Sequence, residues 1–358
     1  MKAERREVKG GYLMSICVEE LSPRDDQEHI DFLDRLGRTS PSVLGYYYPF
    51  YRDMLVEIGV GQPVYLGARR DGELVGLLPA FVRKSALGTV YCSLPYFGPN
   101  AGVLCGDEAR AEIHSALLQA LLDRARADDA LSCAVYTPFM FDEFALYDAV
   151  MPEAIVVNKF TQYLDVRITT WDKGTIARNI RKAKKVGVEI SLDITPERVE
   201  TFYTIYERNC KDYGIPLKPR KCVDFLVSAR VLGHYTSIYF AFHEGHMIGG
   251  LLVIWGPLVA SYYIPCVLAE ARTLQPGPAL IERAIRDAKA RGIRFWNWES
   301  SPSRESGVYR FKKKWGSVEG TYRIYVQAFR PRELFQRLGV DGILRHFPYF
   351  YVYPFDLL

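Results

Sequence analysis

The sequence predicts an α/β (α+β) protein made of two tandem copies of one fold, each a mixed and mostly antiparallel sheet flanked by helices. Three observations support this class. The chain has 358 residues, which is long for a single core. A hairpin-like segment occurs twice. The order of helical and strand patterns is the same in both halves.

The repeat is direct. Segment 65–78 aligns without gaps with segment 238–251, at an offset of 173 residues. Each copy is an apolar strand, an acidic-Gly turn and a second apolar strand. The turn glycines are Gly72 and Gly245, where a positive φ is cheap only for glycine. Gly76 and Gly249 also align, inside the second strand, where a glycine often marks a bulge or a close backbone approach.

The other predicted elements follow the same order. A helix at 113–127 matches one at 280–291, and each runs into a β-rich segment, 131–136 or 293–298. In the second half we expect helices at 196–211, capped by Thr195, and at 221–232, then strands at 237–242, 247–254 and 259–264. The predicted domains are therefore 15–165 and 166–330. A tail rich in Tyr and Phe, 331–358, is expected to pack against the body.

Composition limits the class of function. Hydrophobic residues make up 49% and charged residues 25%, as in an ordinary soluble globular protein. A net charge of +4 is too small to argue for nucleic-acid binding by itself. Seven scattered cysteines, no signal-peptide pattern at residues 1–7 and no long apolar run predict a cytoplasmic protein without a transmembrane segment. The histidines show no metal-ligand spacing, so we expect no metal.

Aromatic and basic residues alternate in the decapeptide 307–316, Gly-Val-Tyr-Arg-Phe-Lys-Lys-Lys-Trp-Gly. It lies just beyond the predicted strand 293–298. Such a segment can stack a planar group and hold its phosphates. The alternative is an aromatic strand with a solvated basic turn.

A second basic cluster lies at 177–188. No acidic residue lies between Lys173 and Val188 to balance its five cations, Arg178, Arg181, Lys182, Lys184 and Lys185. The cluster would suit a polyphosphate, a nucleotide-sugar or an RNA backbone. A solvated helix face is the alternative.

The loop 274–279 precedes a predicted helix and contains Gly277. A helix N-terminus after a glycine presents free N–H groups to an anion such as a pyrophosphate. Pro276 and Pro278 remove two of these donors, and the alternative is that they simply start the helix. The corresponding loop of the first half, 105–108, is acidic, so a phosphorylated donor is expected in the second half.

These motifs resemble those of Fem-type (FemAB-like) peptidyltransferases and their relatives in the GNAT acyltransferase superfamily. The similar patterns are Phe-Lys-x-x-Trp-Gly at 311–316, Arg-x-x-Arg-Lys-Ala-x-Lys-x-Gly-Val at 178–188, and a Pro-Gly pair at 276–277. The resemblance extends from about residue 21 to residue 329. It implies two tandem GNAT domains and transfer of an acyl or aminoacyl group to an amine.

The resemblance also implies site residues. Phe311 would stack on the donor and Lys312 would act on it by charge, while Glu299, at a strand end, is a candidate general base. A salt bridge from Glu299 to Arg304 or Lys312 is the alternative. Donor contacts are expected from Gly277, Pro278, Ala279, Phe311 and Lys312, and substrate contacts from Arg178, Arg181, Lys182, Lys185, Tyr213 and Asn297. The aromatic segments 46–51 and 93–99 could line an acceptor cleft between the domains.

The sequence thus predicts an N-acyltransferase or aminoacyltransferase with Lys312 and Glu299 as catalytic residues. Its co-substrate would be acyl-CoA or aminoacyl-tRNA, with no tightly bound cofactor. The acceptor would be a small-molecule amine, such as a nucleotide- or lipid-linked sugar or another cell-envelope precursor. The alternative is a non-catalytic double-GNAT protein that binds RNA or a nucleotide.

Overall fold

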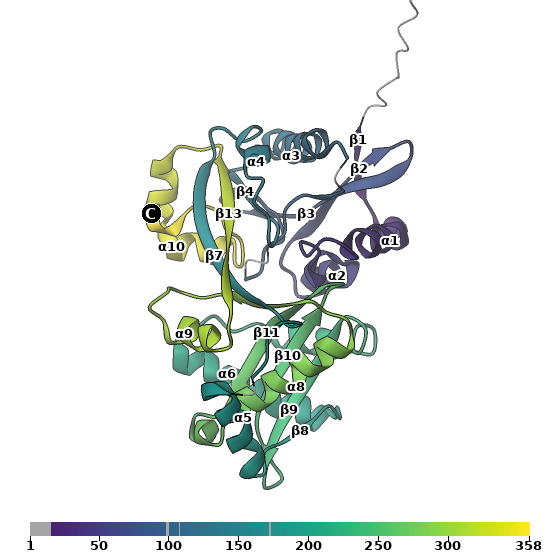
Figure 1. Ribbon diagram of the computed structural model, residues 1–358. Coiled ribbons are helices and arrows are strands. Elements are labelled where there is room, and N and C mark those ends of the chain that lie inside the picture. The colour runs from purple at the N-terminus through teal and green to yellow at the C-terminus, as the bar shows by residue number, and fades with distance from the viewer. Residues whose placement is uncertain (1–15, 98–99, 107, 172) are drawn as a thin grey trace, which may run out of the picture.

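The computed structural model describes residues 16–97, 100–106, 108–171 and 173–358, and the N-terminal stretch read for a signal peptide lies outside them. The chain forms two lobes, with strands β7 and β13 running from one into the other (Figure 1). The first lobe begins with β1 (Cys17–Leu21), α1 (Asp26–Gly37), α2 (Pro49–Glu57), β2 (Gln62–Arg70), β3 (Glu73–Ser85) and β4 (Gly88–Cys92). It continues with β5 (Leu104–Cys105), α3 (Arg110–Ala127), β6 (Ser132–Tyr136), α4 (Ala145–Asp148) and β7 (Ile155–Asp165).

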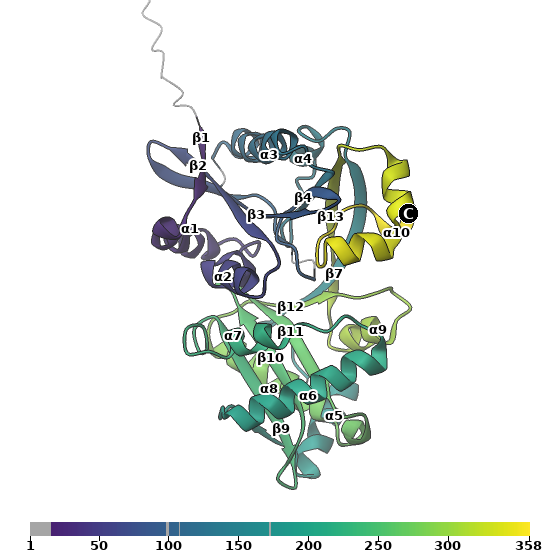
Figure 2. The ribbon, with the colours of Figure 1, turned by 180° about the vertical axis from the view of Figure 1, so that it is seen from behind.

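The second lobe repeats the pattern. Its elements are α5 (Gly174–Lys185), β8 (Glu189–Ser191), α6 (Pro196–Tyr213), α7 (Arg220–Leu226), β9 (Thr236–His243), β10 (His246–Trp255), β11 (Val259–Val267), α8 (Pro276–Ala290), β12 (Phe295–Ser300), α9 (Gly307–Lys314) and β13 (Val318–Ala328). After β13 comes α10 (Arg332–His346), which lies beside the part of β13 that runs into the first lobe (Figures 1 and 2). Helix α8 covers the sheet face seen in Figure 1, and α6 covers the opposite face (Figure 2).

One mixed sheet passes through both lobes. Its strand order is β1-β2-β3-β4-β6-β13-β7-β12-β11-β10-β9-β8, with β5 paired to β3. The last strand of each half crosses over: β7 is antiparallel to β12, and β13 is antiparallel to both β6 and β7. The predicted α/β class with helix-flanked mixed sheets is confirmed. The predicted boundary at 165/166 falls directly after β7, the strand that joins the two parts of the sheet.

The repeated hairpins share one register. Ala68 pairs with Gly76 in the first half, and Ala241 pairs with Gly249 in the second, both at the offset of 173 residues. Each hairpin has a bulge immediately before that glycine. The turn glycines, Gly72 and Gly245, have φ of +82° and +76°.

The strand glycines are needed for close packing, against different neighbours in the two halves. A Cβ on Gly76 would lie 2.4 Å from Cγ2 of Ile113 on α3. A Cβ on Gly249 would lie 2.7 Å from the carbonyl oxygen of Cys266 on β11. The hairpin of the first half therefore accepts a helix at this point, and that of the second half accepts a neighbouring strand.

A core shared by the halves joins the lobes. Residues of α2, α6, α7, β10 and the C-terminal segment belong to one apolar cluster, while two smaller clusters lie under α3 and α8. The aromatic tail contributes Phe335, Phe347 and Phe350 to the shared cluster, so it packs on the body as expected. Within the described residues, no helix combines the length and apolar character needed to cross a bilayer.

Candidate active site

A gap opens between two neighbouring strands of the second half. Strands β11 and β12 run parallel, and their pairing ends at Ser261 and Asn297. Beyond this point the strands frame a cavity of about 180 Å³, lined on this side by Tyr262, Tyr263, Glu299 and Ser300. Strand pairing therefore stops at the edge of the cavity, and side chains supply partners to the main chain there, as at the Glu299 N–H, which donates to Asn297 Oδ1.

The first half supplies the opposite wall. Tyr46, Tyr51, Tyr96 and Phe97 line the cavity, so it lies between the two halves. They belong to the two aromatic segments that the sequence predicts at an acceptor cleft. Gly98 and Pro99, the end of the second segment, lie outside the described residues.

A glycine brings Tyr46 into place. Gly45 lies against β10, and a Cβ there would be 2.6 Å from both the Trp255 carbonyl oxygen and Cγ2 of Ile254. Only a residue without a side chain permits this approach. The short helical turn at 45–47 can therefore lie flat on β10 and β11 and direct the Tyr46 hydroxyl to Glu299.

Glu299 is held by a polar network from three elements. Its Oε1 accepts from the Tyr46 hydroxyl at 2.7 Å and from Asn297 Nδ2 at 2.8 Å. The Asn297 Oδ1 in turn accepts from the Glu299 main-chain N–H at 3.0 Å and from Thr161 Oγ1 at 3.1 Å. Asn297 thus orients both the backbone and the carboxylate of Glu299. The other carboxylate oxygen, Oε2 of Glu299, accepts a hydrogen bond from neither Tyr46 nor Asn297.

Lys312 fixes the strand end. Its side chain is only 3% exposed, and Nζ donates to the carbonyl oxygens of Glu299, at 3.1 Å, and Ser300, at 2.8 Å. Glu299 has φ of +60°, a left-handed conformation unfavourable for a residue with a side chain. The two hydrogen bonds stabilise this conformation. The salt bridge to Arg304 is excluded, because Arg304 bonds Glu319 at 2.7 Å.

Burial changes the acidity of Glu299. It raises the pKa of the carboxyl group above its ordinary value, opposed by the hydrogen bond from Tyr46 and by the nearby charges of Lys312 and Lys218. A raised pKa makes the carboxylate a better proton acceptor near neutral pH.

Lys218 is a site residue that the sequence analysis missed. It lies in the loop between α6 and α7, is 8% exposed, and lines the cavity. Its Nζ is 3.4 Å from the ring centroid of Phe97 and 5.1 Å from that of Tyr263. Burial lowers the pKa of Lys218 to about 8. The sequence alone does not distinguish a lysine between Leu217 and Pro219 from a solvated loop lysine. The only hint of a site role is that Lys218 follows shortly after Tyr213, a predicted substrate contact, in the sequence.

The corresponding gap in the first half is bridged. Parallel pairing of β4 with β6 ends at Cys92 and Ala134. Ser93 then donates its N–H to the Ala134 carbonyl at 2.9 Å, and its Oγ accepts from the Tyr136 N–H at 2.8 Å. These bonds keep the strands together where β11 and β12 separate.

An apolar groove adjoins the cavity. It measures about 490 Å³ and shares Phe97 and Ser300 with the cavity lining. Strand β13 contributes Tyr322 and Ile324, and the C-terminal segment contributes further apolar side chains, among them Leu344. A substrate with an apolar part can therefore extend from the cavity along the tail.

The predicted donor loop lies at the start of α8. Gly277, Pro278 and Ala279 belong to its first turn, and Pro278 and Ala279 are buried. Pro276 and Pro278 carry no N–H, and the Ala279 N–H contacts the Gln275 carbonyl at 3.4 Å. The loop thus offers the Gly277 N–H to an anion, fewer donors than a glycine-rich loop would provide.

The remaining predicted residues lie outside the cavity lining. Phe311 is on helix α9, so the aromatic strand with a basic turn, the alternative for segment 307–316, is not what forms. Ser306 Oγ caps this helix by accepting from the Tyr309 N–H at 3.1 Å. The Phe311 ring packs 6.3 Å from those of Trp298 and Trp315. Tyr213 is 57% exposed at the end of α6. Arg178, Arg181, Lys182 and Lys185 lie on α5, whose apolar side faces the core under α8.

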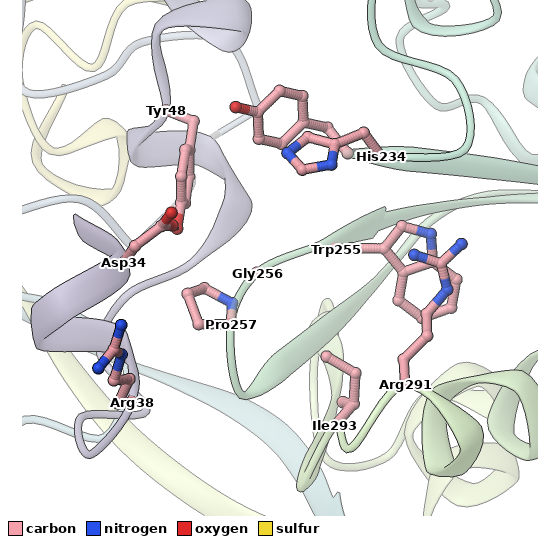
Figure 3. Close-up of a pocket in the computed structure, with 10 residues that line it drawn as sticks. Asp34, Arg38, Tyr48, His234, Trp255, Gly256, Pro257, Arg291 and Ile293 are labelled. Atoms are coloured by element: carbon pink, nitrogen blue, oxygen red, sulfur yellow. The ribbon is translucent and has the colours of Figure 1, made fainter. Parts of the chain in front are cut away.

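A second cleft between the halves has about 430 Å³ (Figure 3). Asp34 and Tyr48 face Trp255 and Arg291 across it. The Tyr48 hydroxyl donates to Asp34 at 2.6 Å, and Arg291 lies 4.7 Å from the Trp255 ring while donating to the Gly233 carbonyl. Asp34, Tyr48 and Arg291 thus already have partners within the protein, so the cavity at Glu299 is the better candidate for an active site.

Comparisons with known proteins agree with the fold. The family described as acetyltransferase (GNAT) domain matches residues 173–299, which contain most of the gap between β11 and β12. FemX has a similar structure, with 13% identity and a TM-score of 0.65 over 86% of this chain and 96% of that one. The C-terminal domain of a putative lysylphosphatidylglycerol synthetase from Agrobacterium fabrum is similar too, with 12% identity and a TM-score of 0.60 over 92% and 99%.

A tandem GNAT protein from the clavulanic acid biosynthesis pathway has 14% identity and a TM-score of 0.54, over 88% of this chain and 99% of that one. No curated protein matches the sequence significantly. At these identities the likeness concerns the fold, and it confirms the predicted Fem-like GNAT architecture.

Proposed function

We propose that this chain, which has a Fem-like GNAT fold, is an N-acyltransferase or aminoacyltransferase whose active site is the cavity around Glu299. The observation that carries the proposal is a half-buried, oriented carboxylate at the open end of the gap between β11 and β12. A carboxylate there meets any amine that enters the cavity.

In the proposed reaction the amine nitrogen attacks the carbonyl carbon of the donor. A C–N bond forms, and the C–O bond of an aminoacyl ester or the C–S bond of a thioester breaks. Glu299 takes a proton from the amine, and the leaving oxygen or sulfur takes one in return. Tyr46 and Asn297 bind Oε1 and so direct the carboxylate toward the reacting amine.

Lys312 has a positioning role in this scheme. Its Nζ is occupied by the carbonyl oxygens of Glu299 and Ser300, so it acts on the reaction by holding the carboxylate-bearing turn. Asn297 also has a positioning role, because it bonds both the carboxylate and the main-chain N–H of Glu299. Glu299 is the group that contacts the reacting amine.

For the donor, aminoacyl-tRNA is favoured over acyl-CoA. Pro276 and Pro278 leave few N–H groups at the start of α8 for a pyrophosphate, while α5 presents a row of cations suited to RNA phosphates. Neither donor would be tightly bound. The acceptor would be an amine, as in a cell-envelope precursor, and the reaction would take place in the cytoplasm. The resemblance to a lysylphosphatidylglycerol synthetase domain supports aminoacyl transfer.

The second candidate is a non-catalytic protein that binds RNA or a nucleotide. The basic face of α5 supports it. It gives no account of the oriented Glu299 carboxylate, which lines the cavity between the halves.

The test is single-turnover transfer from radiolabelled aminoacyl-tRNA and from acyl-CoA, with a mixture of amines as acceptors. Glu299→Gln should lower the rate by on the order of a hundredfold or more, as expected for loss of a general base. Glu270→Gln, on the exposed surface, is the matched control and should leave the rate unchanged. A Glu299→Gln protein that transfers at the wild-type rate would refute the proposed site.

A further inference from the structure

We infer that the acceptor is an amino acid or a similarly small zwitterion, with its amine at Glu299 and its carboxylate at Lys218. The inference rests on the proposed function and specifies its substrate class. It comes from one feature: two oppositely charged side chains share a cavity without bonding each other.

Lys218 lacks an anionic partner. Among the described residues, no hydrogen-bond acceptor and no ion-pair partner within 4.0 Å meets its Nζ, although the side chain is only 8% exposed. Its surroundings are the rings of Tyr96, Phe97 and Tyr263, which stabilise a cation through their π faces. A buried ammonium group without an acceptor is costly, and an anion from outside the chain would offset that cost.

The comparison with Lys312 argues against a purely structural role. Lys312 is also buried, but its Nζ holds two main-chain carbonyl groups. In Lys218 it is the main chain that is held in place. Its N–H donates to the Tyr206 hydroxyl, and its carbonyl oxygen accepts from the Tyr203 hydroxyl. The ammonium group itself is left facing the cavity.

Size and charge define the ligand. A volume of about 180 Å³ admits a small molecule only. One cation, Lys218, and one carboxylate, Glu299, line it, and the other side chains are aromatic or, at Ser300, a hydroxyl. A phosphate would call for further cations or a fork of donors, which an arginine would supply. A single lysine suits a single carboxylate, and an amine beside Glu299 completes an amino acid.

The experiment measures binding without any donor. The twenty proteinogenic amino acids are tested by calorimetric titration, and each one that binds is compared with its C-terminal amide. The wild-type protein should bind at least one amino acid on the order of tenfold more tightly than its amide, because the amide lacks the charge that Lys218 meets.

Lys218→Met should remove this preference for the acid over the amide. Lys221→Met, on the exposed face of α7, is the matched control and should keep it. The comparison of acid and amide on the wild-type protein tests the inference even if the Lys218 variant fails to fold. Equal affinities for acid and amide, or no binding of any amino acid, would overturn the inference.

These titrations, taken together with the single-turnover transfer assay, separate the two proposals. If amino acids bind but no donor acylates them or any other amine, the acyltransfer proposal fails and the binding site stands. If another amine is acylated while no amino acid binds, the substrate class is wrong and the acyltransfer proposal stands.

Discussion

The Nζ of Lys312 lies 3.1 Å from the main-chain oxygen of Glu299 and donates a hydrogen bond to it. The side chain thus reaches back from α9 to the end of β12 and holds a residue whose φ is +60°. The lysine of the Phe-Lys-x-x-Trp-Gly motif therefore supports the geometry of the carboxylate, and the rate of transfer should depend on this contact.

Lys312→Ala should reduce transfer by about 2–3 kcal/mol of transition-state stabilisation, because Glu299 would lose its fixed direction. The carbonyl groups of Glu299 and Ser300 would also lose their donor, and each lost hydrogen bond should cost about 0.5–1.5 kcal/mol in the free energy of unfolding. Single-turnover rates and urea unfolding measure the two effects.

Lys313→Ala and Lys314→Ala are the controls, since both side chains are exposed on the same helix. They should change rate and stability little. Equal losses in all three variants would mean that a diffuse charge effect acts at α9, contrary to the positioning role.

The sequence predicts more of the fold than of the site. Hairpins, helices and strand order follow from local periodicity and from glycines such as Gly245, so they could be read from the chain. The crossing of β7 and β13 between the halves depends on pairing between distant segments, which no local pattern encodes. Glu299 can be identified from the sequence, because it is a carboxylate at the end of a predicted strand. Lys218 cannot be identified in this way, because it is buried by rings of the other half, such as Phe97.

Stability should depend on pH through Lys218. Its pKa is about 8 in the folded protein, against an ordinary value of 10.5, so between these values the unfolded chain binds more protons and stability rises with pH. Below about pH 8 the full cost of the buried charge is present. Relative to Lys218→Met, the wild-type protein should therefore gain stability between about pH 7.5 and about pH 9.5.

Urea unfolding of both proteins at these two pH values checks this. Lys312 also has a pKa lowered to about 8 by burial, but it is common to both proteins and cancels in the difference. A difference in unfolding free energy that stays constant with pH would show that Lys218 is not a buried cation.

Gly45→Ala should weaken the contact between the halves. The new Cβ would meet the Trp255 carbonyl oxygen at 2.6 Å, and the strain should cost about 1–3 kcal/mol in the free energy of unfolding. The shift should also withdraw Tyr46 from Glu299 and lower transfer. Gly106→Ala is the control, because its Cβ would meet nothing within 4 Å. An unchanged unfolding curve for Gly45→Ala would contradict the close approach.

The basic face of α5 is expected to act in donor binding. Lys182→Glu combined with Lys185→Glu should weaken binding of aminoacyl-tRNA and make its affinity less dependent on salt, because fewer counterions are released. Thermal stability should change little, since both side chains are exposed. Filter binding over a range of salt concentrations measures this, with Lys221→Glu as control. Undiminished affinity would leave α5 as a solvated helix face.

The groove beside the cavity should favour substrates with an apolar part. Leu344, 43% exposed on α10, lines this groove, and Val340, 39% exposed on the same helix, does not. Leu344→Glu should therefore raise the KM for the substrate that carries the apolar part, because a charge would have to be desolvated in the groove. Val340→Glu adds the same charge outside it and should leave KM unchanged, and both proteins should remain as stable as the wild type. Equal KM values for the two variants, measured with donors of increasing side-chain length, would show that no substrate enters the groove.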